Sequence, residues 1–387
     1  MIIPGATKVL QWNHWLLGFI GLWPFDLNNS KFIFFFAYAM VHTFLQYGDL
    51  IEHISDLNHV VANLTETIII NMLIFKMSIY RINTRQLREL IQNIEKDFST
   101  ELYNTADEMT IFLKYNSLSR TIVQCFSIMC LISPILFYIH PLLSHLLAYN
   151  DSMGNSSIAF VFPIHFRLFF NLTEERTYYI IYACEILLVP TCTCGYNGPI
   201  CLMITLVLHT CGQISILASQ VKSMIHDPKA VHQQLKQIVI KHRRVISLVA
   251  NLQSAYSAIL LPEVSGMTFV ICLGSYNVIT TSAVTDSSKF LKFLFYILTL
   301  TFQLFSLCYI GECLITESTN LYNAFCNYEW YNVSPDHAKL LVMCLLRSQR
   351  PLTLTTGKFF TFSLESFRIK TCGAKLIVKV NSNLIST

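Results

Sequence analysis

The chain alternates long apolar segments with polar stretches, and the apolar segments are long enough to cross a bilayer. A transmembrane helix needs about 20 mostly apolar residues. Seven segments meet this need, near residues 32–50, 57–80, 122–147, 178–215, 258–284, 290–315 and 352–379. The pattern therefore predicts an all-α integral membrane protein with seven transmembrane helices.

Two of these spans depart from a plain apolar helix. The second carries Asn63, Glu66, Asn71 and Lys76, and we expect these side chains to face other helices or water rather than lipid. The fourth is too long for one crossing and contains Gly195-Tyr196-Asn197-Gly198-Pro199. Proline removes a helix donor and glycine relaxes the backbone, so we expect a kink or an unwound turn there.

Basic residues lie mainly in the loops that follow spans two and four. The first of these loops contains Arg81, Arg85, Arg88, Lys96, Lys114 and Arg120, and the second contains Lys222, Lys229, Lys236, Lys241, Arg243 and Arg244. Basic loops stay in the cytoplasm. The charge pattern therefore predicts a cytoplasmic N-terminus and an extracellular C-terminus.

Glycosylation sequons support this orientation. Asn150, Asn155 and Asn171 each begin one in the predicted outer loop, whereas Asn332 begins one in a segment predicted to be cytoplasmic. The orientation is inverted relative to G-protein-coupled receptors. The chain also lacks an Asp-Arg-Tyr triplet after span three and an Asn-Pro-x-x-Tyr motif in span seven. These observations argue against that class.

Composition agrees with a membrane protein and offers little catalytic chemistry. Hydrophobic residues make up 53% of the chain and charged residues 13%, against roughly 25% charged in a soluble domain. No phosphate-binding loop, nucleophile elbow or zinc-protease motif is present, so we expect no enzyme activity and no cofactor. Cys192-x-Cys194, with Cys184 and Cys201 nearby, allows a metal site, a disulfide or ordinary apolar packing.

Amphipathic helices are predicted in the cytoplasmic segments. Apolar residues at helical spacing form one stripe, at Val231, Leu235, Ile238, Val245, Val249, Leu252 and Tyr256. A second amphipathic helix is predicted over 316–346, with Trp330, Tyr331, Leu341 and Leu345 as its candidate contact residues. These faces could pack within one chain or form a subunit interface, and periodicity alone favours neither.

The outer halves of the spans offer aromatic residues suited to an apolar ligand pocket with a few polar groups. The candidates are Phe137, Tyr138, Tyr178, Tyr182, Ile186, Tyr276, Thr280, Phe293, Tyr296 and Thr299. Aromatics at this depth also serve in packing or in the interfacial belt. Glu185 is an acid within a span, so it could orient a ligand, pair with a neighbour or lie in a wet vestibule.

The C-terminal third carries a recognisable series of motifs. They are Gln303-Leu304-Phe305, Cys308-Tyr309-Ile310-Gly311-Glu312, Trp330-Tyr331, Arg347-Ser348-Gln349-Arg350-Pro351-Leu352, Leu354-Thr355-Thr356-Gly357-Lys358-Phe359 and Leu364-Glu365-Ser366-Phe367. The series closely resembles the C-terminal signature of insect odorant receptors. Trp12-Asn13-x-Trp15-Leu16-Leu17 resembles their N-terminal stretch, and the finer likeness is to the receptor expansions of ants, bees and wasps.

The resemblance implies a subunit of an odorant-gated, non-selective cation channel in the cell membrane of olfactory sensory neurons. Four subunits would surround one pore, with an obligate co-receptor completing a heterotetramer and a volatile odorant as ligand. It further implies spans and pocket over 1–315, a cytoplasmic anchor helix over 316–350 and a pore-lining helix with its tail over 351–387. The implied pore or gate residues are Thr355, Lys358, Leu376, Ile377 and Val380.

The chain departs from the family pattern after Phe367, where the spacing to Lys370-Thr371 is about two residues short. Two residues rotate a helix by roughly 200°. Lys375 and Lys379 would then stand near a pore for cations, which predicts weak conduction, unless this tail comes from a splice variant or a misread exon boundary. A gustatory-type receptor of the same fold remains an alternative, and a G-protein-coupled receptor or a transporter is favoured less.

Overall fold

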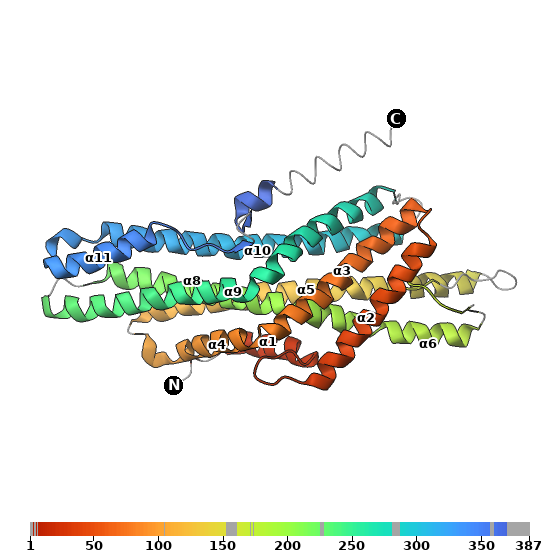
Figure 1. The fold of residues 1–387 in the computed structure, drawn as a ribbon, viewed down its shortest axis with the longest axis horizontal. Coiled ribbons are helices and arrows are strands. Elements are labelled where there is room, and N and C mark those ends of the chain that lie inside the picture. Colours follow the sequence, from red (N-terminus) through yellow and green to blue (C-terminus); the bar gives the residue numbers. More distant parts are fainter. Residues whose placement is uncertain are drawn as a thin grey trace, which may run out of the picture.

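Four long helices run side by side along the length of the molecule (Figure 1). They are α5 (Ala106–Asp151), α8 (Gly198–Lys222), α9 (Pro228–Thr280) and α10 (Ser287–Asn327). The structure is a computed structural model that describes residues 3, 5, 7–103, 105–151, 161–170, 172, 174–224, 228–280, 287–356 and 360–369. The loops that were predicted to be cytoplasmic gather at one end, here called the basic end, and residues 161–170 lie at the opposite, outer end.

Shorter elements surround this group. They are α1 (Lys8–Phe19), α2 (Asn29–Glu52), α3 (Leu57–Ile82), α4 (Thr84–Glu95), the 3-10 turns η1 (Lys96–Phe98), η2 (Thr100–Leu102) and η4 (Trp330–Asn332), α6 (Glu175–Glu185), α7 (Leu188–Pro190), the π-helix η3 (Thr191–Tyr196), α11 (Pro335–Ser348), β1 (Thr355–Thr356) and β2 (Phe360–Thr361). In Figure 1, α2 and α3 cross the bundle obliquely, and α11 lies beside α10 at the basic end.

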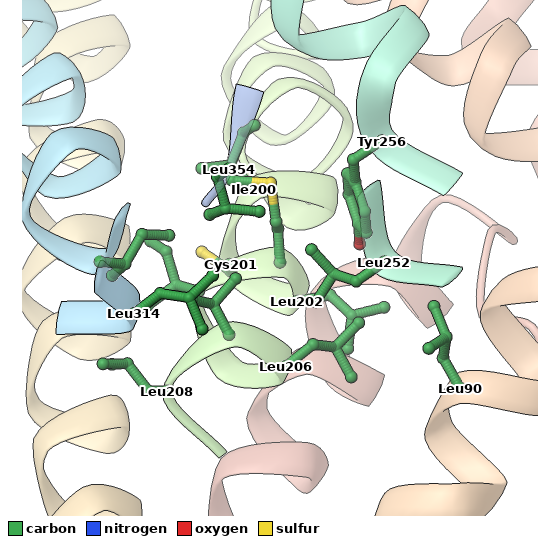
Figure 2. Packing of buried hydrophobic residues seen from close by; sticks show 14 of the residues in the cluster. Leu90, Ile200, Cys201, Leu202, Leu206, Leu208, Leu252, Tyr256, Leu314 and Leu354 are labelled. Atoms are coloured by element: carbon green, nitrogen blue, oxygen red, sulfur yellow. The ribbon is translucent and has the colours of Figure 1, made fainter. Parts of the chain in front are cut away.

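Helix α8 is the central element of the fold. Its side chains are buried on every face from residue 198 to residue 212, which is the pattern of a helix enclosed by other helices. Figure 2 shows Ile200, Leu202 and Leu206 of α8 between Tyr256 of α9 and Leu314 of α10. The apolar core is therefore a layer of helices wrapped around α8, not the interface between two domains.

Five described stretches of helix are long and apolar enough to cross a membrane. They are Leu57–Ile82, Ala106–Ile139, Glu175–Lys222, Val231–Thr280 and Phe290–Asn327, and they match predicted spans two to six. The first predicted span corresponds to α2, which exposes large apolar side chains such as Ile33, Val41 and Phe44. Exposed apolar side chains in such number are expected where the solvent is lipid.

The predicted break in span four is confirmed, and its form is a π-helix. Helix α6 ends at Glu185, the three-residue α7 follows, and the chain is a π-helix from Thr191 to Tyr196. Helix α8 then begins at Gly198, with Pro199 in its first turn. Proline is tolerated there because the N–H groups of a first turn have no partner within the helix. The change in geometry lies in the middle of the membrane-crossing stretch, where it can shape a cavity.

Two sequence predictions near the C-terminus are corrected by the structure. The predicted helix over 316–346 is two helices, because α10 ends at Asn327 and Pro335 starts α11. The seventh predicted span does not begin at residue 352: β1 and β2 pair antiparallel there, and helical residues begin at residue 364 and continue to 369, where the described residues end. The first of these corrections follows from proline, which starts helices readily but cannot continue one.

The hairpin of β1 and β2 is docked on the bundle by residues of the C-terminal motifs. A Cβ atom at Gly311 would lie only 2.2 Å from the Phe362 carbonyl oxygen, so glycine is needed for this close approach. The next residue, Glu312, accepts a hydrogen bond of 3.1 Å from the Leu364 backbone N–H, at the start of the final helical residues. The Gln253 side chain accepts one of 3.0 Å from Thr355 N–H.

This docking predicts the effect of a methyl group at residue 311. We expect Gly311→Ala to displace the hairpin and destabilise the protein by about 1–3 kcal/mol, as overpacking does in other cores. A fall in the melting temperature of purified protein would measure it. Gly18→Ala is the matched control, since a Cβ atom there meets only the His14 ring, at 3.6 Å. Equal melting temperatures for the two variants would contradict this account of Gly311.

Candidate ligand-binding site

An apolar cavity lies among α3, α5, the α6–η3 segment and α10. Its volume is about 110 Å³, the order of size at which apolar cavities hold a single small ring. It is lined by Glu66, Ile69, Ile70, Cys130, Ser133, Pro134, Phe137, Tyr138, Pro163, Ile164, Glu185, Leu188, Val189, Cys192, Tyr196, Asn197, Tyr296, Thr299, Leu300 and Gln303. The mostly apolar wall with a few polar groups is typical of a small-molecule site.

Polar lining groups are placed where they could orient a ligand. The Glu185 carboxylate is buried and lies 2.8 Å from His42 Nε2 on α2. The side-chain oxygen of Asn197 is buried with no hydrogen-bond partner in the described part of the chain. An unsatisfied buried acceptor costs free energy, so a ligand that donates a hydrogen bond would gain affinity there.

Glu185 thus adopts one of the roles its sequence context left open. It pairs with a neighbour, His42, and it also lines the cavity. Helix α2 contributes His42 from outside the cavity wall, so the pair joins α2 to α6. A change in α2 can therefore reach the cavity through this carboxylate.

The outer loop covers one side of the cavity. Pro163 and Ile164 line it, and the next residue is fixed to α3: His165 donates its backbone N–H to Glu66 at 2.9 Å, and its Nδ1 lies 3.0 Å from the same carboxylate. Burial alone would lower the pKa of His165, but the Glu66 carboxylate holds that pKa above its ordinary value. The loop is therefore fastened by an ion pair as well as by its backbone.

A buried ion pair forms the floor beneath the cavity. Lys76 Nζ of α3 lies 2.7 Å from the Glu263 carboxylate of α9, and both side chains are almost fully buried. The Tyr196 hydroxyl donates to Glu263 at 3.2 Å, and the amide of Gln303 donates to the same carboxylate. Tyr196 and Gln303 also line the cavity, so a ligand would rest against partners of this pair.

The structure divides the ten predicted ligand residues into three groups. Phe137, Tyr138, Tyr296 and Thr299 line the cavity. Tyr178, Tyr182 and Phe293 are buried one layer behind, where Tyr182 and Tyr138 exchange hydroxyl-to-carbonyl hydrogen bonds and Phe293 packs edge-on against Phe137.

The remaining three candidates lie away from the cavity. Ile186 is half exposed on the outside of the bundle. Tyr276 bonds to Asn58 near the outer end of α3, and Thr280 bonds back to its own helix. Near the outer end of α9, the side chain that faces the other helices is Asn277, which is buried and donates to the Thr65 hydroxyl. The sequence pattern did not predict this rotation of α9. Contact between ligand and any named residue stays a prediction.

Several lining residues were not among the sequence candidates. Glu66 was expected only to face another helix or water, and Gln303 was noted only as part of a motif. A polar residue within an apolar span was the available signal for both. Tyr196 and Cys192 could not be placed because the π-helix sets which way their side chains point.

The cysteine cluster does not gather into a metal site in the described residues. Cys192, Cys194 and Cys201 are free thiols that are buried or partly buried, as ordinary packing residues are. Cys184 is exposed and also free. The burial of Cys192, Cys194 and Cys201 agrees with apolar packing, one of the three alternatives left open by the sequence.

Comparison with known proteins identifies the family. Residues 56–372 match the family described as 7tm Odorant receptor. The chain is a member of the insect odorant receptor family. It is 24% identical over 353 residues to Odorant receptor 13a of Drosophila melanogaster. The aligned region covers 82% of this chain and 78% of that protein.

Solved structures show the same fold. The olfactory receptor OR5 from Machilis hrabei superposes with a TM-score of 0.77 at 16% identity, over 96% of this chain and 97% of that one. The complex of that receptor with eugenol superposes with a TM-score of 0.76 at 14% identity, over 98% of this chain and 99% of the other. The odorant receptor is thus a multi-pass membrane protein with the seven-helix fold and is not an enzyme. The finer likeness to hymenopteran receptors stays a prediction.

The cavity geometry predicts graded effects of tyrosine truncation. We expect Tyr138→Ala to shift the odorant dose–response strongly or reorder a ligand panel, because this side chain lines the cavity. Tyr182→Ala should act more weakly, since Tyr182 supports Tyr138 from behind. Ile186→Ala, outside the bundle, is the control. Odorant-evoked currents at matched surface levels provide the measurement, and parental responses from both tyrosine variants would refute this placement.

The ion pair beneath the cavity predicts a non-additive pair of substitutions. Lys76→Met alone leaves Glu263 buried without its cation, and removing one partner of a buried pair typically costs about 3–5 kcal/mol. The double variant Lys76→Met with Glu263→Leu should recover a large part of that loss. Melting temperatures of purified protein would give both values. Additive losses would show that the two groups do not interact as the structure indicates.

Proposed function

We propose that this odorant receptor is the ligand-binding subunit of a heteromeric, odorant-gated cation channel in olfactory sensory neurons. The observation that carries the proposal is the apolar cavity beneath the loop at 161–170, with its few polar groups and a buried ion pair below. Its size suits a small volatile molecule with one ring or a short chain. A solved relative with this fold, OR5 from Machilis hrabei, forms a complex with eugenol.

The path from ligand to pore runs along α10. Tyr296, Thr299 and Gln303 line the cavity, and Gly311 and Glu312 hold the hairpin that leads into the final helical residues. Roughly two to four turns of the continuous helix α10 separate the cavity-lining residues from Gly311 and Glu312. A shift of α10 on ligand binding would therefore move the start of the last helix.

The pore assignment is part of this proposal. Of the implied pore or gate residues, Thr355 lies in β1, where its backbone bonds to Gln253. Lys358, Leu376, Ile377 and Val380 lie outside the described residues. We expect the helix that begins at residue 364 to line the pore, and we expect Thr355, in the hairpin that precedes this helix, to lie near the entrance of the pore.

Recording from cells that express the chain with an odorant receptor co-receptor tests the proposed function. A panel of small volatile compounds should evoke inward cation current only when both subunits are present. Current from the co-receptor alone sets the baseline for each compound. A chain that reaches the surface with the co-receptor and responds to no compound in a broad volatile panel would count against the assignment.

The anchor at the basic end offers a face for the co-receptor. Trp330 and Tyr331 are exposed, and so are Met343 and Leu346 of α11. Leu341 is instead buried against the chain's own helices, and Leu345 is partly buried against the same core. The Leu341 side of α11 therefore packs within the chain. The interface on the opposite, exposed side, with Met343 and Leu346, stays a prediction.

This division refines the expected effect of substitutions in α11. Met343→Asp with Leu346→Asp should abolish co-purification with the co-receptor while the melting temperature stays at the parental value. Leu341→Asp should instead unfold the anchor, because it places a charge in the core. Lys339→Asp on the exposed surface is the control for added negative charge. Normal co-purification of the Met343 and Leu346 double variant would exclude this face as the interface.

A further inference from the structure

Three side chains with metal-ligand chemistry meet where α2 turns into α3 at the outer end. Asp49 lies in the last turn of α2, His53 follows four residues later as the C-cap of that helix, and His59 lies in the first turn of α3. Asp49 Oδ1 lies 3.3 Å from His53 Nδ1, and Asp49 Oδ2 lies 2.7 Å from His59 Nε2. One ligand atom from each residue falls within 4.8 Å of the other two.

We propose that Asp49, His53 and His59 form an extracellular binding site for a divalent transition metal, with Zn²⁺ as the expected ion. Zinc bonds to imidazole nitrogen and carboxylate oxygen at roughly 2.0–2.2 Å, which places tetrahedral ligands roughly 3.4 Å apart. The two imidazoles need only a small rotation to reach that spacing. Two histidines and one carboxylate with water in the fourth position are a familiar zinc ligand set.

The surroundings of the three residues suit a metal site. Asp49 is buried, and Asn63 Nδ2 donates to its Oδ2 at 2.8 Å, which holds the carboxylate in place as outer partners of metal ligands do. The His53 and His59 rings stack with centroids 4.3 Å apart, so both present an edge to the same carboxylate. His53 is about half exposed, which leaves the ion a path from solution.

No other group in the described residues brings together three such ligand atoms. His232 and His337 approach each other within 3.0 Å at the basic end, but they make only a pair. Two imidazoles on an exposed surface bind zinc more weakly than three ligands of which one is buried and preorganised. This second pair is therefore a useful internal control.

The site lies next to the loop that covers the cavity. The His59 ring packs edge-on against His165, with centroids 4.7 Å apart, and His165 is bonded to Glu66 in the cavity wall. Arg167 of the same loop bonds to Glu52 and to the Leu45 carbonyl of α2. A metal that holds His59 and α2 together would stiffen this loop, so we expect zinc to reduce the odorant response.

Metal binding is tested first without any odorant. Micromolar Zn²⁺ should raise the melting temperature of the purified full-length receptor by at least about 2 °C, because a ligand of the folded state stabilises it. Mg²⁺ at the same concentration should not. The rise should disappear in His53→Ala and His59→Ala and persist when His232 and His337 are both changed to Ala. His53→Cys, which supplies a thiolate ligand, should restore it.

Either of two results would overturn the site: no zinc-dependent rise in the parental protein, or the same rise in both single variants. Asp49 is left unchanged because it also holds Asn63. A second arm, which rests on the proposed function, applies Zn²⁺ outside cells during odorant recording and expects an inhibition that His59→Ala abolishes. Failure of this arm alone, with binding intact, would reject the coupling to the loop but not the metal site.

Discussion

The buried ion pair between Lys76 and Glu263 constrains the packing at the centre of this receptor. Taking two charges out of water is costly, and the cost is offset only when geometry and hydrogen bonds are both good. Lys76 Nζ also donates to the Tyr196 carbonyl at 3.2 Å and lies over the Tyr196 ring, while Gln303 bonds to Glu263. Four segments must therefore meet at one point: α3, η3, α9 and α10.

The same constraint explains where the cavity lies. The π-helix lets Tyr196 reach the pair, and a Cβ atom at Gly195 would lie only 2.7 Å from the Leu73 side chain, so this turn packs closely against α3. Above it, the wall of the cavity is apolar, and the outer loop closes one side through His165. A ligand in this cavity would thus lie between the buried ion pair on one side and the outer loop on the other, and Tyr138 and Tyr296 line the remaining wall.

The motifs that identify the family have structural roles as far as the described residues show. Gly311 provides space for the hairpin, Glu312 bonds to the start of the last helix, and Ser318 Oγ accepts from Leu352 N–H at 2.9 Å. These contacts hold the chain where it leaves the anchor and turns back toward the membrane. The residues that line the cavity can vary without changing these contacts. The motifs therefore identify the family but do not identify the ligand.

The pattern of apolar segments determined the helical membrane class and spans two to six, because a segment that crosses lipid must satisfy its backbone internally and be apolar along its length. The glycine and proline residues at 195–199 determined the break in span four. The motifs determined the family. Tertiary structure decided what depends on helix rotation: Tyr296 faces the cavity and Tyr276 does not, Leu341 is buried and Met343 is exposed. It also brought Asp49, His53 and His59 together, and joined Lys76 to a carboxylate 187 positions away. Local sequence cannot specify these contacts, since each is set by how separate helices pack around α8.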